Sequence, residues 1–351
     1  MAADVFPGFR GNRQIARALA SMMEVGRIPQ TILLAGPEGV GKATLVRKFA
    51  KRLLGDAERI ELDDLSREEN RQIIAEREKW PSEKRADDPL LFSSHPDFVT
   101  FCPDGPLRQI SIQQMRLARE RAQLRPLKGD WRVFLIDQID RANPQAADSL
   151  LKTLEEPPSH LILFLTAENA FDLPPTIRSR SIIFHMNPLS EEEMREFVAE
   201  RKLGDPARRV ALAAGAPGLA AALDLTLHDK RRAVMFSMLE AAAGALGFAQ
   251  WVKLSESFLA SKSEKLEFYF KPAYSLLEDM LTLKSGGARL RNPDMAVEIE
   301  HLSRRVDFDW IREAVKRIDE LVDLQRRNVQ KGPSVDQLVV GLRSLQPRSA
   351  Q

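Results

Sequence analysis

A glycine-rich loop between an apolar run and an amphipathic repeat constrains the fold of this chain more than any other feature. Residues 31–35 form a short run that favours a strand, and residues 43–54 repeat apolar side chains at helical spacing. Between them lie three glycines, Gly36, Gly39 and Gly41. A strand, a glycine loop and a helix in this order form a nest of backbone N–H groups that binds phosphate, to which Lys42 adds a mobile charge. The sequence therefore predicts an α/β P-loop domain that binds a nucleoside triphosphate.

One position departs from the P-loop pattern, which places a serine or threonine directly after the lysine to hold Mg²⁺. Here Ala43 follows Lys42, and Thr44 comes one residue later. A shift of one residue turns a helical side chain by about 100°, so Thr44 cannot simply take over the metal contact. The pattern predicts a loop that can still bind nucleotide but has lost a part used in magnesium-assisted hydrolysis.

Length, charge and cysteine content exclude several classes of protein. The 351 residues allow about two or three domains. The net charge of +2 gives no global basic field for nucleic acid, and the single cysteine, Cys102, excludes a disulfide framework or a multi-cysteine zinc site. No apolar run approaches about 18 residues and no signal peptide is recognisable, so we expect a cytoplasmic protein without a membrane partner.

Apolar runs alternate with helical repeats through the first half of the chain, which predicts a parallel sheet covered by helices. The predicted strands are residues 31–35, 94–101, 131–136, 160–166 and 181–184. Helices are predicted over residues 6–28 and 110–124. A further helix begins at Asn143-Pro144, where a capping residue precedes proline, and stops before Pro157-Pro158.

The strand at residues 131–136 ends in Asp137-Gln138, where a P-loop ATPase carries an acid for Mg²⁺ followed by a glutamate that polarises water. Asp137 has the metal position. Gln138 stands where the base should be, and an amide cannot accept a proton at neutral pH. This second defect is independent of Ala43 and strengthens the prediction of impaired hydrolysis.

Two polar features have an ordinary structural interpretation. Residues 56–89 mix acidic and basic side chains, which favours a solvated helix or a mobile insertion over a binding patch. His95 precedes Pro96 with no histidine or cysteine nearby, so we interpret it as a turn-capping residue and not as a metal ligand.

The C-terminal half is helical in pattern from Ser190 onward. Apolar stripes predict amphipathic helices through about residues 226–345, for example Ile311, Val315, Ile318 and Val322. Lys271-Pro272 and Gly286-Gly287 are predicted helix breaks or loops. In isolation these stripes indicate only a helical core.

Several motifs taken together resemble the clamp-loader branch of the AAA+ ATPases. They are GPEGVGK at 36–42, LLKTLEEPP at 150–158 after VFLIDQID at 133–140, TAEN at 166–169 and TIRSRS at 176–181. The likeness is dense over residues 6–188 and weaker beyond. Because the hydroxyl and the glutamate are missing, the chain resembles most a subunit of that branch that does not hydrolyse ATP.

The resemblance implies a set of site residues. The nucleotide site would be lined by Gly36, Gly39, Gly41, Lys42, Ala43 and Thr44, with Asp137 as a vestigial metal carboxylate and Asn169 as the first sensor. Whether ATP or ADP occupies this site is left open. The family commonly carries a four-cysteine zinc module after the P-loop helix. This chain has the charged segment 56–89 there, so we predict no zinc and no other metal site.

Arg180 is the residue to which the resemblance assigns a direct role in hydrolysis. Ser179-Arg180-Ser181 matches the family's Ser-Arg-Cys motif, with serine in place of the cysteine. The arginine of that motif reaches the ATP of the adjacent subunit and neutralises charge on its γ-phosphate. Gly218 stands where active members of the family carry a sensor arginine, a third missing part.

The resemblance also implies a division of the chain and a set of partners. The expected parts are a P-loop domain at residues 1–188, a helical lid domain at 189–225 and an all-α collar domain at 226–351. The expected partners are tau, gamma and delta subunits in a hetero-oligomeric ring of the DNA polymerase III holoenzyme, with the sliding clamp and primed DNA reached through that complex.

Other hypotheses remain open at this stage. A catalytically active clamp-loader ATPase of the tau or gamma type is opposed by Ala43, Gln138 and Gly218, and a stand-alone P-loop enzyme gives no account of the helical C-terminal third. Basic side chains such as Arg121, Arg125 and Lys128 could face DNA, although solvated surface is the simpler interpretation.

Overall fold

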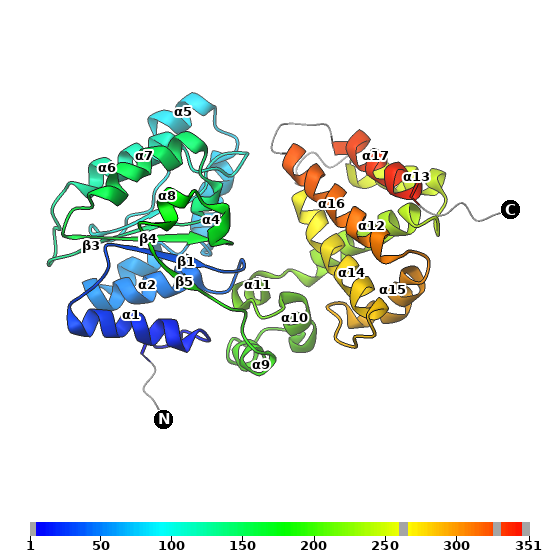
Figure 1. Cartoon of the computed structure of the whole chain (residues 1–351), viewed down its shortest axis with the longest axis horizontal. Helices are drawn as coiled ribbons and strands as arrows, with labels where there is room; N and C mark the ends of the chain where they lie inside the picture. The colour runs from blue at the N-terminus through cyan, green and yellow to red at the C-terminus, as the bar shows by residue number, and fades with distance from the viewer. Residues whose placement is uncertain (1–4, 260–265, 326–330, 346–351) are drawn as a thin grey trace. The chain divides into compact units, whose positions relative to one another are not determined.

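The computed structural model describes residues 5–259, 266–325 and 331–345 of the chain. Contacts between Cα atoms divide it into two compact units (Figure 1). The first comprises Met1–Glu200 with Gly215–Leu219, and the second comprises Arg201–Ala214 with Ala220–Gln351. Within the described residues, no helix combines the length and the apolar character needed to cross a membrane.

The first unit is built on a five-stranded parallel sheet with the strand order β2-β3-β4-β1-β5. Its strands are β1 (Thr31–Ala35), β2 (Phe98–Phe101), β3 (Arg132–Ile136), β4 (Leu161–Ala167) and β5 (Ile182–His185). Every residue of β1 to β4 is buried, which explains why these strands are continuous apolar runs, whereas β5 at the sheet edge is partly exposed. All five predicted strands are present, although the second begins at Phe98, four residues later than predicted.

Helices cover both faces of this sheet (Figure 1). Helices α1 (Arg13–Val25) and α2 (Lys42–Leu54) share a core with Leu34 and with Phe164, whose ring lies edge-on to Phe49 at 5.0 Å. Helices α6 (Ile112–Ala122), α7 (Pro144–Glu155) and α8 (Pro175–Arg178) share the opposite core with Leu33. Successive residues of β1 thus point to opposite layers, and the predicted α/β P-loop fold is confirmed.

Helix α7 begins and ends where the sequence predicts. The Asn143 side chain accepts a hydrogen bond from the Ala146 N–H at 2.8 Å, and Pro144 occupies the first helical position. The last helical residue is Glu155, just before the two prolines. These local signals fix the carboxyl end of α7, which becomes important below.

The charged segment after α2 is helical and is tied to the sheet domain by two buried arginines. It forms α3 (Ala57–Leu62), α4 (Glu68–Arg77) and α5 (Ser82–Asp87). Arg47 of α2 pairs with Asp64 at 2.7 Å, and Arg77 pairs at 2.8 Å with Asp104, whose side chain is 7% exposed. His95 caps its turn as predicted, since its Nδ1 accepts the Asp97 N–H at 3.1 Å.

The next helices are shared between the two units. Helix α9 (Glu191–Glu200) and residues Gly215–Leu219 belong to the first unit, and α10 (Pro206–Ala213) belongs to the second. Helix α11 (Pro217–Ala222) spans the assignment boundary. The division into parts at residues 1–188, 189–225 and 226–351 stays a prediction.

The described residues of the second unit form helices joined by turns, so the predicted all-α C-terminal region is confirmed. After α10 come α12 (Leu225–Ala242), α13 (Phe248–Leu259), α14 (Glu267–Lys284), η3 (Pro293–Met295), α15 (Ala296–Ser303), α16 (Phe308–Gln325) and α17 (Lys331–Arg343). The large core side chains include Trp251, Phe270, Leu276 and Trp310.

The predicted helix break at Lys271-Pro272 is wrong, because Pro272 lies inside α14. Proline in a helix interior costs about 3 kcal/mol through a lost hydrogen bond and a clash. Phe270, Ala273 and Leu276 are fully buried around it, and that burial offsets the cost. The predicted loop at Gly286-Gly287 follows the end of α14 and is confirmed.

Candidate nucleotide-binding site and interface arginine

The loop between β1 and α2 has the shape that a phosphate cradle needs. Gly39 and Gly41 have φ values of 77° and 102°, which other residues rarely adopt. At Gly36 a side chain is excluded by space, since a Cβ atom would lie 2.3 Å from the Met186 carbonyl oxygen. The three predicted glycines therefore come together in one tight turn at the carboxyl end of β1.

Lys42 is directed onto this loop. Its Nζ donates hydrogen bonds to the carbonyl oxygens of Gly36 and of Pro37, the latter at 2.8 Å, and the residue is 8% exposed. Burial lowers the pKa of the Lys42 ammonium, against the attraction of surrounding carboxylates. Those carboxylates belong to Asp137, Glu168, Asp140 and Glu38. The lysine charge is thus held by backbone carbonyls and acids of its own domain.

The position after Lys42 offers no ligand for a cation. Ala43 packs its methyl group against the core beneath α2. Thr44 is half-buried on the same helix, about 100° further round. The cradle therefore has the backbone shape for phosphate, but the side chain at position 43 does not fit the magnesium ion that accompanies nucleotide in a working site.

Asp137 is brought to the same edge of the sheet, at the end of β3. Its Oδ1 accepts the Thr166 hydroxyl at 2.6 Å, and the Thr166 oxygen accepts the Gln138 N–H at 2.8 Å. Burial raises the pKa of the Asp137 carboxyl, and the Thr166 hydrogen bond, Lys42 and Arg47 oppose that rise. Asp137 is thus held by a hydroxyl from β4, beside a glutamine that cannot act as a base.

The predicted sensor residue Asn169 uses its side chain locally. Its Oδ1 accepts the Phe171 N–H at 3.0 Å and its Nδ2 donates to Asp172 at 3.2 Å. These bonds cap the short helix η2 (Ala170–Asp172). Among the described residues, no hydrogen bond of Asn169 joins it to Lys42 or Asp137, so the structure does not bring it into one network with them.

Gly218 lies directly on the P-loop. Its N–H donates to the Gly39 carbonyl at 2.8 Å, and a Cβ atom at position 218 would lie 3.0 Å from that oxygen and 3.1 Å from the Gly39 Cα atom. An arginine could enter this position only if the backbone moved. The contact of Gly218 with Gly39 could not be predicted, because no local pattern links residues so far apart in the chain.

The side chain of Arg180 has its hydrogen-bond partners outside the P-loop. Its Nη2 donates to Glu155 Oε1 at 2.9 Å, its Nη1 donates to the Thr176 carbonyl at 3.1 Å, and 34% of its side chain is exposed. None of its hydrogen bonds or ion pairs within the described part of the chain reaches the P-loop residues. The guanidinium is therefore available at the surface to a group outside this domain.

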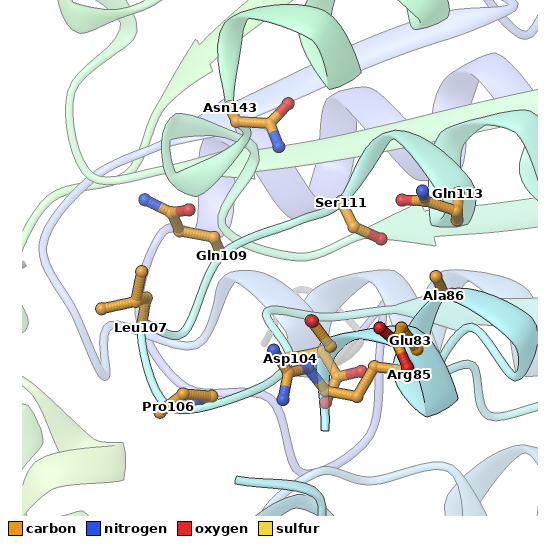
Figure 2. A pocket seen from close by; sticks show the side chains of 11 residues that line it. Glu83, Arg85, Ala86, Asp104, Pro106, Leu107, Gln109, Ser111, Gln113 and Asn143 are labelled. Carbon is orange, nitrogen blue, oxygen red and sulfur yellow. The ribbon is translucent and has the colours of Figure 1, made fainter. Parts of the chain in front are cut away.

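A separate pocket of about 400 Å³ lies elsewhere in the first unit (Figure 2). Polar side chains from α5, from the loop at residues 104–109 and from the starts of α6 and α7 line it, including Arg85, Asp104, Gln109, Ser111 and Asn143. This pocket could not be predicted from the sequence, because its walls come from separate segments. Within the described residues, no group of three or more histidine, cysteine or acidic side chains could hold a metal ion.

The sequence comparisons match this chain to subunits of DNA polymerase III. A family model described as "DNA polymerase III, delta subunit" matches residues 11–190. The gamma subunit of DNA polymerase III from Buchnera aphidicola subsp. Schizaphis graminum is 31% identical over 188 residues, which cover 54% of this chain and 46% of that protein. The tau subunit from Escherichia coli K12 is 26% identical over 265 residues, 73% of this chain and 38% of that protein.

The chain thus spans less than half the length of these curated relatives. Among solved structures, a gamma-subunit-related protein of DNA polymerase III from Thermotoga maritima aligns over 93% of this chain and 98% of its own, at 18% identity and a TM-score of 0.43.

Proposed function

The chain belongs to the family described as DNA polymerase III, delta subunit, and on that premise we propose that it is a non-hydrolysing clamp-loader subunit of the delta-prime type. It occupies a place in a ring of ATPase subunits and carries no polymerase or ATPase activity of its own. With those subunits it helps to load the sliding clamp onto primed DNA in the cytoplasm.

The observation that supports this proposal most is that three groups needed for hydrolysis are absent around a P-loop whose backbone conformation is kept. Position 43 lacks the hydroxyl for magnesium, and position 138 lacks the base. Position 218 lacks the sensor arginine, and a side chain there would press on the Gly39 backbone. Metal binding, activation of water and charge stabilisation are separate tasks, so a single accident does not account for the loss of all three.

We propose that this subunit contributes to ATP hydrolysis at the neighbouring subunit's site through Arg180. An arginine acting in trans must be exposed, must carry its charge at every physiological pH and must be held by a rigid element. Exposure of the Arg180 side chain and its hydrogen bond to the Thr176 carbonyl support this role. In the proposed ring, its guanidinium neutralises charge on the γ-phosphate bound by the neighbouring subunit.

The remaining parts of the chain receive structural roles in this proposal. Residues 1–188 form the nucleotide-binding-like domain, residues 189–225 its lid, and residues 226–351 the collar that joins the ring. The expected neighbours are subunits of the tau, gamma and delta types. The helical composition of the second unit supports a collar, since amphipathic helices supply large apolar surfaces for assembly.

A second candidate is an active clamp-loader ATPase of the tau or gamma type. It is favoured by the identity to gamma and tau subunits and by the intact glycines and lysine of the P-loop. The two proposals make opposite predictions for the isolated chain, because an active subunit carries its own metal ligand and base.

The deciding experiment is an ATPase assay on the purified chain, with and without primed DNA, beside an active gamma-type subunit as the positive control. We expect no turnover above background. Co-purification with gamma- and delta-type subunits tests the partners in the same preparation. Sustained hydrolysis by the isolated chain would replace the leading proposal with the second candidate.

A further inference from the structure

We propose that Glu155 is a positioning residue for Arg180, which holds the guanidinium in the orientation in which it meets the neighbouring subunit's ATP. The inference rests on the proposed trans-acting role of Arg180 and extends it to a residue outside the Ser179-Arg180-Ser181 motif. The two residues are 25 positions apart in the sequence and come together only in the fold.

Hydrogen bonds from both Nη atoms of Arg180 hold its guanidinium plane in one orientation. Nη2 donates to Glu155 Oε1 at 2.9 Å, and Nη1 donates to the Thr176 carbonyl at 3.1 Å and to Ser179 Oγ at 3.4 Å. A guanidinium carries five N–H donors. These contacts use the Nη atoms and leave the Nε–H and a second Nη2 hydrogen for the oxygens of a phosphate.

Both elements that carry this pair are anchored in the same core. Glu155 is the last residue of α7, whose Leu150 and Leu154 are buried, and Arg180 follows α8, whose Ile177 is buried in the same cluster. The carboxylate and the base of the arginine side chain are therefore held at a fixed separation. A long side chain ordered before its target arrives loses less entropy when it binds, which is the usual benefit of a preorganised site.

Helix stability does not explain an acid at position 155. The carboxyl end of a helix carries partial negative charge, so a glutamate in the last turn is unfavourable there unless a cation offsets it. Arg180 supplies that cation. Glu156 follows directly and is also exposed, and its side chain makes no hydrogen bond or ion pair among the described residues. It therefore provides a matched control, with the same charge in almost the same place but without the contact.

The test compares variants of this chain in the reconstituted clamp loader on primed DNA, with kcat and KM for ATP measured separately. We expect Glu155→Ala to lower kcat about 2- to 5-fold, the range that an exposed ion pair can supply, with little change in KM. Glu155→Gln should keep most of the rate, because its amide oxygen can still accept from Nη2. Glu156→Ala should match the unchanged protein.

A double variant separates positioning from a general effect of charge. Glu155→Ala combined with Arg180→Ala should be no slower than Arg180→Ala alone, since a positioning residue has nothing left to position. The inference is overturned if Glu155→Ala leaves kcat unchanged, raises it, lowers it equally without Arg180, or prevents assembly of the ring. If Arg180→Ala itself has no effect, the trans-acting role fails and this inference fails with it.

Discussion

Arg180 is the single residue whose removal should affect the complex most. In reconstituted loader, Arg180→Ala should leave assembly intact, because the side chain is exposed, and should depress ATPase activity. A site that depends on an arginine finger loses about 10³-fold or more, and hydrolysis at the other sites in the ring dilutes this in the total rate. Arg180→Lys keeps the charge without the planar fork and should recover only part of the activity. An unchanged rate for Arg180→Ala would contradict the proposed role.

His95 predicts how stability depends on pH. Its Nδ1 accepts the Asp97 N–H, so protonation there would break a buried hydrogen bond. Burial lowers the pKa of His95 despite the attraction of Asp97 and Asp56, and Lys128 and Arg59 lower it further. The unfolded chain therefore binds the proton more readily. The contribution of neutral His95 to the free energy of unfolding should be fully present above about pH 6.5. It should decrease as the pH falls below that value, by up to about 1.4 kcal/mol per pH unit.

Urea unfolding between pH 7.5 and about 5 measures this dependence. His95→Gln should flatten the curve. Some slope should remain in that variant, because burial also lowers the pKa of His228. Equal slopes for the variant and the unchanged chain would show that His95 is not the titrating group.

At the scale of elements, the insertion α3 to α5 depends on the pairing of Arg77 with Asp104. Both side chains are buried, at 5% and 7% exposure, and the guanidinium also donates to the Asp88 carbonyl. Arg77→Met leaves the Asp104 carboxylate buried without its cation, a change that typically costs about 3–5 kcal/mol. Arg77→Met with Asp104→Leu should recover part of that loss, because it removes the unpaired charge.

Urea unfolding measures both variants, with the exposed pair Arg71 and Glu68 as a control, since Arg71→Met should change stability by less than about 1 kcal/mol. If Arg77→Met also changed stability by less than about 1 kcal/mol, the insertion would depend on other contacts.

The elements that the sequence predicted well are those with local causes. Strands buried on both faces are continuous apolar runs, and α7 has a cap and a proline at its start and prolines after its end. The predicted helix break at Pro272 was wrong because the helix that contains this proline is stabilised by side chains far away in sequence. For the same reason, the contact of Gly218 with Gly39 and the pair of Glu155 with Arg180 could not be predicted, although three of these four residues had been singled out.

At the scale of the whole molecule, the chain contains a P-loop domain and a helical unit. In the proposed ring, the parts needed for hydrolysis are divided between this chain and its neighbours. An active AAA+ site needs its own metal ligand and base together with an arginine from the adjacent subunit. Under the proposed function, the isolated chain therefore lacks groups of two kinds, those absent at positions 43 and 138 and those that only assembly supplies.

This division predicts that repair of the two substituted positions will not produce an ATPase. Ala43→Ser with Gln138→Glu returns a hydroxyl after Lys42 and a carboxylate after Asp137. The repaired chain still has no arginine at position 218, where a side chain would press on the Gly39 backbone, and no neighbour that supplies a finger. Since absence of a finger alone typically costs about 10³-fold, turnover by the repaired chain should stay at least that far below an active gamma-type subunit.

Nucleotide binding, followed by fluorescence of a labelled ATP with and without Mg²⁺, reports whether the hydroxyl has restored a metal contact independently of turnover. Turnover by the repaired chain alone at the rate of an active subunit would mean that Ala43 and Gln138 are the whole defect, and that neither the lid nor the ring is needed for hydrolysis.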